Sequence, residues 1–168
     1  IKYSKYNIRN SKIYNNKSDG FDGDWSDGII LNSSFNNNNN DGIDISGSNV
    51  KIIEADMSYN GDKSLSVGED SNVTIENSKI SNSLYGLVSK DLSHLYIINT
   101  EIFNNKFGIA AYRKKPIFGG GIIKLKNNKL SSNEINHVRD EYSKILEKNI
   151  EFEINYLDHI DLLKKNNR

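Results

Sequence analysis

The stretch Asn39-Asn40-Asp41-Gly42-Ile43-Asp44-Ile45-Ser46-Gly47-Ser48-Asn49-Val50-Lys51-Ile52 decides the fold, because its pattern of glycine, asparagine and apolar residues recurs in both directions along the chain. A glycine or serine followed by an apolar residue returns every 22 residues, and two further apolar columns keep steps of 22 or 23 until one step of 28. Such self-similarity is typical of a solenoid. The three columns are Phe21, Ile43, Leu65, Leu87 and Ile109; Ile8, Ile30, Ile52, Ile75, Ile97 and Leu125; and Ile13, Phe35, Met57, Ile80, Ile102 and Leu130.

Each period also carries short alternating runs such as Val50-x-Ile52 and Leu65-x-Val67, which predict strands of about three to five residues. In a meander of hairpins successive strands would run antiparallel, and equivalent residues would not stack. In a parallel coil equivalent residues lie one strand spacing apart, about 4.8 Å. We therefore predict an all-β, single-stranded parallel β-helix, a solenoid with 22 residues per coil.

Asparagine marks the predicted corners of the coil. Asparagine tolerates the left-handed backbone conformation that corners need, and its amide can hydrogen-bond to the asparagine of the next coil. The low-complexity run Asn36 to Asn40 falls in register with this pattern, so we interpret it as a corner. The two columns are Asn10, Asn32, Asn77, Asn99 and Asn127, interrupted by Glu54, and Asn16, Asn38, Asn60, Asn105 and Asn133, interrupted by Ser83.

This pattern resembles the right-handed parallel β-helix of the pectin lyase-like superfamily over roughly residues 6 to 152. The resemblance supplies the right-handed sense, in agreement with the general preference for right-handed crossovers. We predict about six to seven coils within residues 1–152, with a loop insertion at residues 112–121 that contains Pro116 and three glycines. Residues 153–168, in which Tyr156, Leu157, Ile160, Leu162 and Leu163 have helical spacing, are expected to form a C-terminal capping segment or tail.

A partial catalytic motif lies within the repeat. Asn40-Asp41-Gly42 followed by Gly61-Asp62-Lys63 resembles the polygalacturonase pattern, in which Asn-Thr-Asp-Gly is followed one coil later by Gly-Asp-Asp. The resemblance implies that Asp41 and Asp62 share the acid and base roles of glycoside hydrolysis. Lys63 replaces the second aspartate of the pair, and Leu84-Tyr85-Gly86 stands where the family has Gly-His-Gly. The alternative is that both aspartates cap tight turns, and the departures favour a protein without catalysis.

The strand face that carries this motif is the predicted binding surface. An extended, acidic polysaccharide would contact Asp22, Asp44, Lys63, Tyr85, Lys90, Arg113 and Lys115. Five aspartates crowd adjacent coils, and a high density of carboxylate oxygens suits Ca²⁺, although the spacing matches neither an EF-hand nor the nonapeptide calcium repeat. A solvated acidic face is the alternative, and no other cofactor is expected. The calcium candidates are Asp19, Asp22, Asp24, Asp41 and Asp44.

Composition limits the remaining function classes. The chain has 22 basic and 22 acidic residues and no recognised nucleic-acid motif, so nucleic-acid binding has little support. No apolar stretch approaches the 18 or more residues of a transmembrane helix, and the absence of cysteine excludes disulfides and thiolate metal sites. Because the chain starts at Ile1 without an initiator methionine or signal peptide, we interpret it as a fragment or processed form of an extracellular or cell-surface protein.

Three functions are consistent with these observations. The first is a carbohydrate-binding or degenerate polysaccharide-processing β-helix. The second is an active glycoside hydrolase or epimerase-like enzyme of the pectin lyase-like superfamily that uses Asp41 and Asp62. The third is a structural surface spacer or adhesin stalk. The sequence leaves oligomeric state open, and fold alone does not choose among these functions because one fold hosts many.

Overall fold

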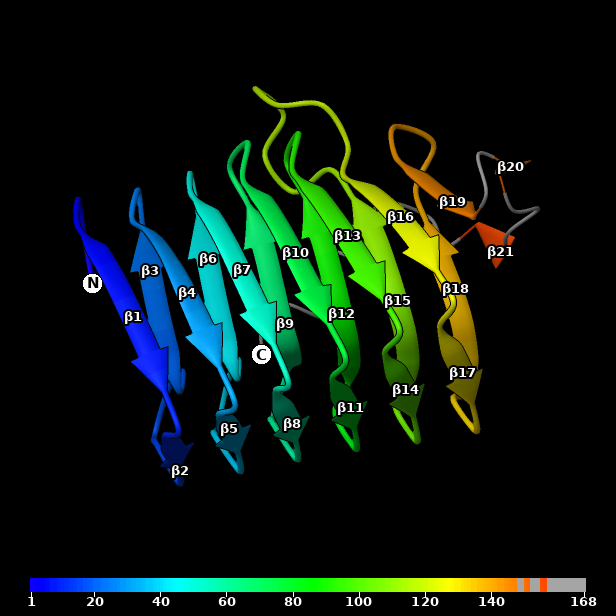
Figure 1. The fold of residues 1–168 in the computed structure, drawn as a ribbon. Coiled ribbons are helices and arrows are strands. Elements are labelled where there is room, and N and C mark those ends of the chain that lie inside the picture. Colours follow the sequence, from blue (N-terminus) through cyan, green and yellow to red (C-terminus); the bar gives the residue numbers. More distant parts are fainter. Residues whose placement is uncertain (148–149, 152–154, 157–168) are drawn as a thin grey trace.

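Parallel strands of successive coils stack into three sheets in the computed structural model, which describes residues 1–147, 150–151 and 155–156 (Figure 1). Each complete coil contributes one strand to each sheet, so strand order within a sheet advances by three. The 7-stranded sheet, here called sheet A, carries the predicted binding surface. Its strands are β3 (Phe21–Asp24), β6 (Ile43–Ser46), β9 (Lys63–Gly68), β12 (Tyr85–Lys90), β15 (Phe107–Tyr112), β18 (Ile135–Arg139) and β21 (Asn155–Tyr156).

The other two sheets complete the coil. The 8-stranded sheet, here called sheet B, ends in an antiparallel pair of β19 with β20, whereas its other pairs are parallel. Its strands are β1 (Lys5–Arg9), β4 (Asp27–Leu31), β7 (Asn49–Ile53), β10 (Asn72–Glu76), β13 (His94–Ile98), β16 (Ile122–Lys126), β19 (Lys144–Glu147) and β20 (Ile150–Glu151). The 6-stranded sheet, here called sheet C, contains β2 (Lys12–Tyr14), β5 (Ser34–Asn36), β8 (Asp56–Ser58), β11 (Lys79–Ser81), β14 (Glu101–Phe103) and β17 (Lys129–Ser131).

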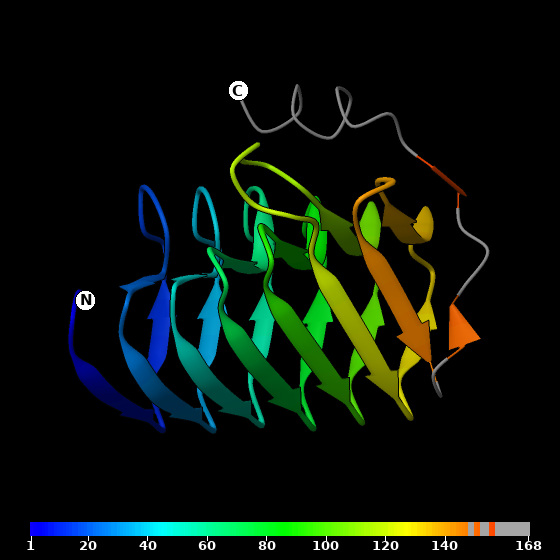
Figure 2. The ribbon, with the colours of Figure 1, turned by 90° about the horizontal axis from the view of Figure 1, so that it is seen from above.

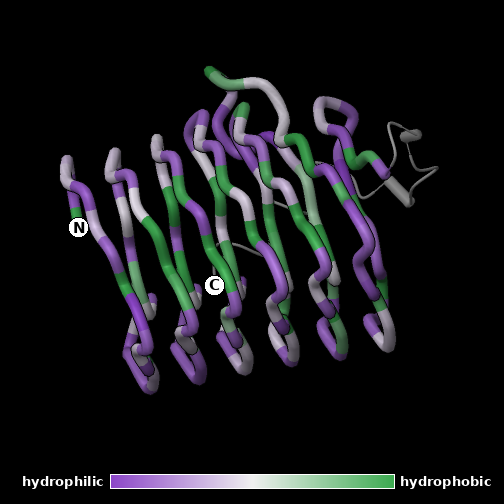
Figure 3. The backbone as a smooth tube through the Cα atoms, viewed as in Figure 1, coloured by the Kyte–Doolittle hydropathy of each residue, from purple (hydrophilic) through white to green (hydrophobic). Residues whose placement is uncertain are grey.

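The predicted apolar columns are confirmed as in-register stacks. Ile30 pairs with Ile52, Ile52 with Ile75, and Ile97 with Leu125 across the 28-residue step. These side chains fill one narrow interior core that runs the length of the solenoid, and hydrophilic residues gather at the turns (Figure 3). Because each coil presents only a few inward side chains, a chain with 36% hydrophobic residues suffices for this fold.

Each corner combines a left-handed residue with a buried polar residue that follows it. The first asparagine column, including Glu54, has positive φ as predicted. The prediction is wrong for the second column, because the residue before each asparagine takes the positive φ instead, such as Asn37 at 56° and Tyr59 at 56°. The second-column asparagines are then free to turn inward. The Asn38 amide nitrogen donates to Asn60 Oδ1 at 3.0 Å, and Asn60 Nδ2 donates to the Phe35 carbonyl at 3.0 Å.

A loop joins β15 to β16. Strand β15 continues through Tyr112, so the loop spans residues 113–121. Asp91 Oδ1 accepts the backbone N–H groups of Lys114 and Lys115, each at 2.7 Å. These hydrogen bonds hold the loop over the turns of the preceding coils, where both views show it (Figures 1 and 2).

The predicted C-terminal capping segment lies outside the described residues, apart from Asn155–Tyr156, which forms strand β21 in sheet A beside β18. No helix in the described ranges is long and apolar enough to cross a membrane.

We expect Asn60→Ala to destabilise the fold by about 3 kcal/mol, because it removes the acceptor of Asn38 and leaves buried polar groups unpaired. Urea unfolding followed by circular dichroism measures the change. The control Asn72→Ala, at an exposed position in β10, should change the free energy of unfolding by less than about 0.5 kcal/mol. Equal effects of the two variants would contradict a role for the inward ladder.

Candidate functional site

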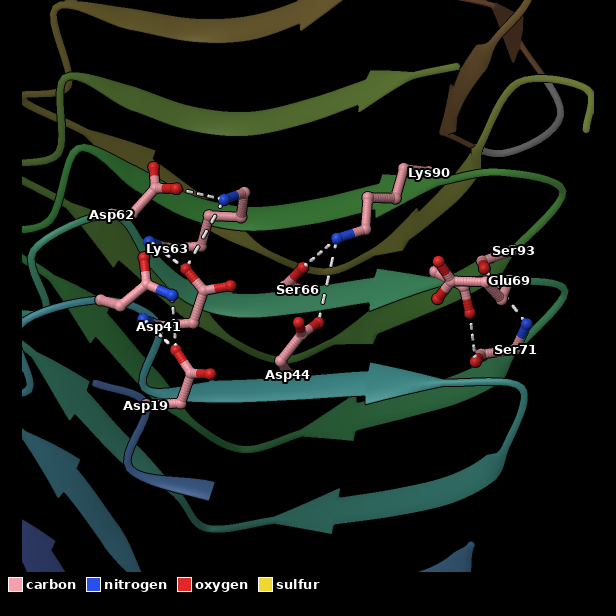
Figure 4. A network of polar contacts seen from close by, with 12 residues as sticks. Asp19, Asp41, Asp44, Asp62, Lys63, Ser66, Glu69, Ser71, Lys90 and Ser93 are labelled. Atoms are coloured by element: carbon pink, nitrogen blue, oxygen red, sulfur yellow. Dashed lines mark hydrogen bonds and ion pairs between the residues drawn. The ribbon is translucent and has the colours of Figure 1, made fainter. Parts of the chain in front are cut away.

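Charged and polar side chains gather on the outward face of sheet A, over β6, β9 and β12 (Figure 4). The inward neighbours Ile43, Ile45, Leu65 and Val67 belong to the interior core, so the alternating positions Asp44 and Ser66 point outward. Asp44 and Ser66 are directly in register on adjacent strands. The coil stacking therefore brings residues that are 22 positions apart in the sequence into one polar surface.

Lys63 holds the two predicted catalytic carboxylates together. Its ammonium group lies 3.5 Å from Asp41 Oδ1 and contacts Asp62 Oδ2, and its backbone N–H donates to Asp41 Oδ1 at 3.0 Å. Asp41 and Asp62 thus lie on adjacent coils beside one another, as the sequence spacing predicts. Only 4% of Lys63 is exposed. Lys63 stands where the polygalacturonase pattern has its second aspartate, and it places a buried cation between the Asp41 and Asp62 carboxylates.

Burial sets the protonation states of this cluster. It raises the pKa of Asp41 to about 6, although the Lys63 ammonium opposes the shift. Burial alone would lower the pKa of Lys63, but the neighbouring Asp41, Tyr112 and Asp62 raise it, so Lys63 stays protonated. At neutral pH the cluster contains an ionised Asp41 paired with Lys63, and below about pH 6 the Asp41 carboxylate takes up a proton.

A second lysine lies farther along the strands. Lys90 Nζ donates to Ser66 Oγ at 2.8 Å and lies 3.9 Å from Asp44 Oδ1. Asp44 Oδ1 and Asp62 Oδ1 are buried atoms that accept no hydrogen bond within the described part of the chain. Lys90 and Asp44 are thus brought together as the predicted binding surface requires, and Ser66 joins them although sequence reasoning did not select it.

The loop cations divide among different partners. Lys115 forms an ion pair with Glu69, and the Arg113 guanidinium lies 3.5 Å from the centre of the Tyr142 ring. Lys114 is the loop cation that interacts electrostatically with the cluster. Burial and the charges of Lys90 and Lys63 lower its pKa. Lys114 lies between the two predicted binding residues Arg113 and Lys115, and its position beside the cluster does not follow from the repeat, because the repeat does not specify the direction of a loop insertion.

Tyr85 lies in an apolar environment. Its ring is fully buried, stacks on Phe107 with centroids 4.8 Å apart, and its hydroxyl accepts or donates no hydrogen bond to the described residues. Burial raises its pKa. The ring is therefore not open to solvent at the predicted binding surface.

The predicted calcium ligands do not converge. Asp19 Oδ1 accepts the Asp41 backbone N–H at 2.9 Å, which is a corner role, while Asp24 lies 4.0 Å from Lys2. Asp22 and Asp44 are in register, and burial and the nearby Asp24, Asp44 and Asp19 carboxylates raise the pKa of Asp22. In residues 1–147 no three acidic or histidine side chains are grouped to hold a metal ion. These residues do not fit a calcium cage, and calcium binding stays a prediction.

Comparisons with known proteins agree with this architecture. The family model described as the right handed beta helix region matches residues 1–161. A crystal structure of pectate lyase Pel9A is similar at 14% identity, with a TM-score of 0.49, covering 85% of this chain and 46% of that one. The A-module of the mannuronan C-5 epimerase AlgE4 from Azotobacter vinelandii is similar at 14% identity, with a TM-score of 0.39, covering 85% of this chain and 58% of that one.

The chain thus spans about half the length of the solved structures it matches. No curated protein sequence matches it significantly.

We expect Asp41→Asn to remove a pH dependence of stability. Because the folded-state pKa of Asp41 is raised to about 6, the folded protein binds more protons than the unfolded chain between about pH 4 and pH 6. The wild type should therefore lose stability relative to the variant as the pH rises through this range, and the difference should be constant above it. Urea unfolding of both proteins at pH 4, 5, 6 and 7 measures this, and a wild type that gains stability relative to the variant as the pH rises would contradict the raised pKa.

Proposed function

The chain belongs to the right-handed β-helix family, and from this premise we propose that it binds an extended acidic polysaccharide, without cleaving it, along the outward face of sheet A. The observation that carries the proposal is the charged surface formed by Asp44, Asp62, Lys63, Lys90 and Lys114. Among the described residues, two of its carboxylate oxygens, Asp44 Oδ1 and Asp62 Oδ1, accept no hydrogen bond. The hydroxyl groups of a sugar would donate to these oxygens, and its carboxylates would accept from the ammonium groups.

Lys114 explains the preference for an acidic ligand. Its side chain is accessible to a ligand, and its pKa is lowered because partial desolvation and two other lysines disfavour its charged form. A uronate carboxylate beside Lys114 would relieve this repulsion, and a neutral sugar would not. With such a ligand, the proposed place of action is outside the cell or at its surface.

Lys63 explains why we propose binding without cleavage. Glycoside hydrolysis needs one carboxylic acid to protonate the leaving oxygen and one carboxylate to activate water or attack the sugar. The Lys63 ammonium contacts both Asp41 and Asp62, so neither carboxylate is free to activate water or to attack the sugar. One observation favours a second candidate, a hydrolase or epimerase-like enzyme: the pKa of Asp41 near 6 suits a general acid.

We expect Lys114→Glu to weaken binding to polygalacturonate and alginate by about tenfold, a difference of about 1.4 kcal/mol. Affinity electrophoresis at low salt measures the binding, and the effect should shrink at high salt because the site is partly exposed. The matched control is Lys126→Glu, an exposed lysine in β16 of sheet B, which should bind like the wild type.

Equal weakening in the two variants would contradict a site on sheet A. New reducing ends or unsaturated products that disappear in Asp62→Asn would establish the enzyme instead. A chain that neither binds nor cleaves these polymers, with or without Ca²⁺, would support the structural spacer.

A further inference from the structure

The corner that joins sheet A to sheet B carries aromatic side chains in the first two coils. Tyr3, Trp25 and Gly47 take equivalent positions there, 22 residues apart, with positive φ of 51°, 45° and 61°. Asparagine takes most left-handed positions of the other two corners. The left-handed conformation is strained for a bulky side chain. Two neighbouring corners that keep aromatic residues in this conformation therefore point to a role for the rings.

Tyr3 and Trp25 form an aromatic pair that is open to solvent. Their rings stack with centroids 5.6 Å apart and an interplanar angle of 19°, yet Tyr3 is 72% exposed and Trp25 is 48% exposed. Lys2 Nζ lies 5.1 Å from the centre of the Trp25 ring and 4.0 Å from the Asp24 carboxylate. Contacts with neighbouring residues thus hold the pair in place without covering it, and exposed apolar surface of this kind marks a binding site.

Gly47 ends the stack and leaves space beside the indole ring. A Cβ atom at position 47 would lie 2.6 Å from both Cδ1 and Nε1 of Trp25, which is too close for a real contact. The positive φ of Gly47 also disfavours any other residue. The third coil therefore adds no side chain to the aromatic stack.

A hollow of about 550 Å³ lies beside the pair and is here called the corner hollow. Besides the two rings, it is lined by Ser4, Gly47 and the first residues of β1, β4 and β7, which are Lys5, Asp27 and Asn49. Lys5 and Asp27 are in register, and Asp27 Oδ1 accepts the backbone N–H of Asn49 at 2.7 Å and its side-chain amide at 3.1 Å. The corner hollow thus combines an aromatic wall with a polar one.

We propose that the corner hollow binds a pyranose ring of a neutral oligosaccharide. One face of a pyranose presents C–H groups, which would pack on the Tyr3 and Trp25 rings and remove apolar surface from water. The hydroxyl groups at the rim of the sugar would donate to the Asp27 carboxylate and accept from the Asn49 amide. An aromatic lining with a few convergent polar groups is the usual composition of a small-molecule site.

The charges around the corner hollow favour a neutral sugar over an acidic one. Lys2 lies beside Asp24, and Lys5 is in register with Asp27, so each cation has an acidic neighbour. Hydrogen bonds from Asn49 and the charge of Lys5 lower the pKa of Asp27, so this carboxylate is ionised at neutral pH. An ionised carboxylate accepts hydrogen bonds from hydroxyl groups but repels a uronate.

The corner hollow is separate from the charged surface of sheet A. It lies on the sheet B side of the corner in the first three coils, whereas the charged surface follows β6, β9, β12 and the loop that carries Lys114. The two sites are therefore independent, and either can bind sugar without the other.

The chain contains a single tryptophan, so intrinsic fluorescence reports on this site alone. The protein is titrated with cellohexaose, mannohexaose and xylohexaose while Trp25 emission and its quenching by acrylamide are measured. We expect at least one of these neutral sugars to shift the emission saturably, with a Kd of about 1 mM or lower, and to protect Trp25 from the quencher.

Tyr3→Ala removes half of the aromatic wall and keeps the reporter, and we expect it to weaken binding about fivefold. The matched control is Tyr59→Ala, because Tyr59 is also an exposed corner tyrosine, 60% exposed with a φ of 56°, but lies between sheets C and A. It should bind like the wild type. Asn49→Ala tests the polar wall without changing a ring and should also weaken binding.

The absence of a saturable emission change with all three sugars would overturn the proposal, as would equal weakening in Tyr3→Ala and Tyr59→Ala. An emission shift on raising the protein concentration without sugar would also overturn it, because the aromatic pair would then join two copies of the chain. Lys114→Glu should bind the neutral sugars like the wild type. This variant separates the corner hollow from the proposed acidic polysaccharide site, since it weakens only the latter.

Discussion

The in-register stacking of successive coils is the constraint on which the rest of this structure depends. Parallel strands supply the backbone hydrogen bonds, but short strands alone fix register weakly. The corners specify the register that the short strands fix only weakly. At each corner a left-handed residue is followed by a residue whose backbone N–H donates to a side-chain oxygen one coil away, as Ser26 does to Ser48 at 2.7 Å and Ser48 to Ser71 at 3.0 Å. A slip by one residue would break these ladders at all three corners at once.

The same stacking creates the charged surface of sheet A. Any residue type that repeats at one position is placed about one strand spacing from its equivalent, so burial and the nearby carboxylates, Asp44 among them, raise the pKa of Asp22. Repulsion between stacked carboxylates is relieved where a cation lies between them. Lys63 and Lys90 are those cations, since both contact aspartates of the preceding coils. Charge complementarity between coils, together with the Lys63–Asp62 pair within one coil, determines which side chains can stand on this face.

The repeat in the sequence was enough to predict the register of all three sheets, the left-handed residues of the first asparagine column and the placement of Asp41 and Asp62 on adjacent coils. Features that depend on contacts outside the repeat were not predictable. The serine column at the third corner escaped notice because serine is common in turns, and the contact of Arg113 with Tyr142 depends on the path of a loop. The burial of Tyr85 was missed because strand alternation says which face a side chain takes, and does not say what covers that face.

The buried lysines distinguish this face from an ordinary solvated solenoid surface. A lysine is almost never fully buried unless it is paired, and removing its partners leaves a costly unpaired charge. Lys63 with Asp41 and Asp62 satisfies that requirement, yet Asp62 Oδ1 and Asp44 Oδ1 accept no hydrogen bond from the residues that the structure describes. A purely structural stalk gains nothing from desolvating two lysines and leaving two acceptors open. The proposed polysaccharide surface does gain, because sugar hydroxyl groups would pair with the same acceptors in the bound state.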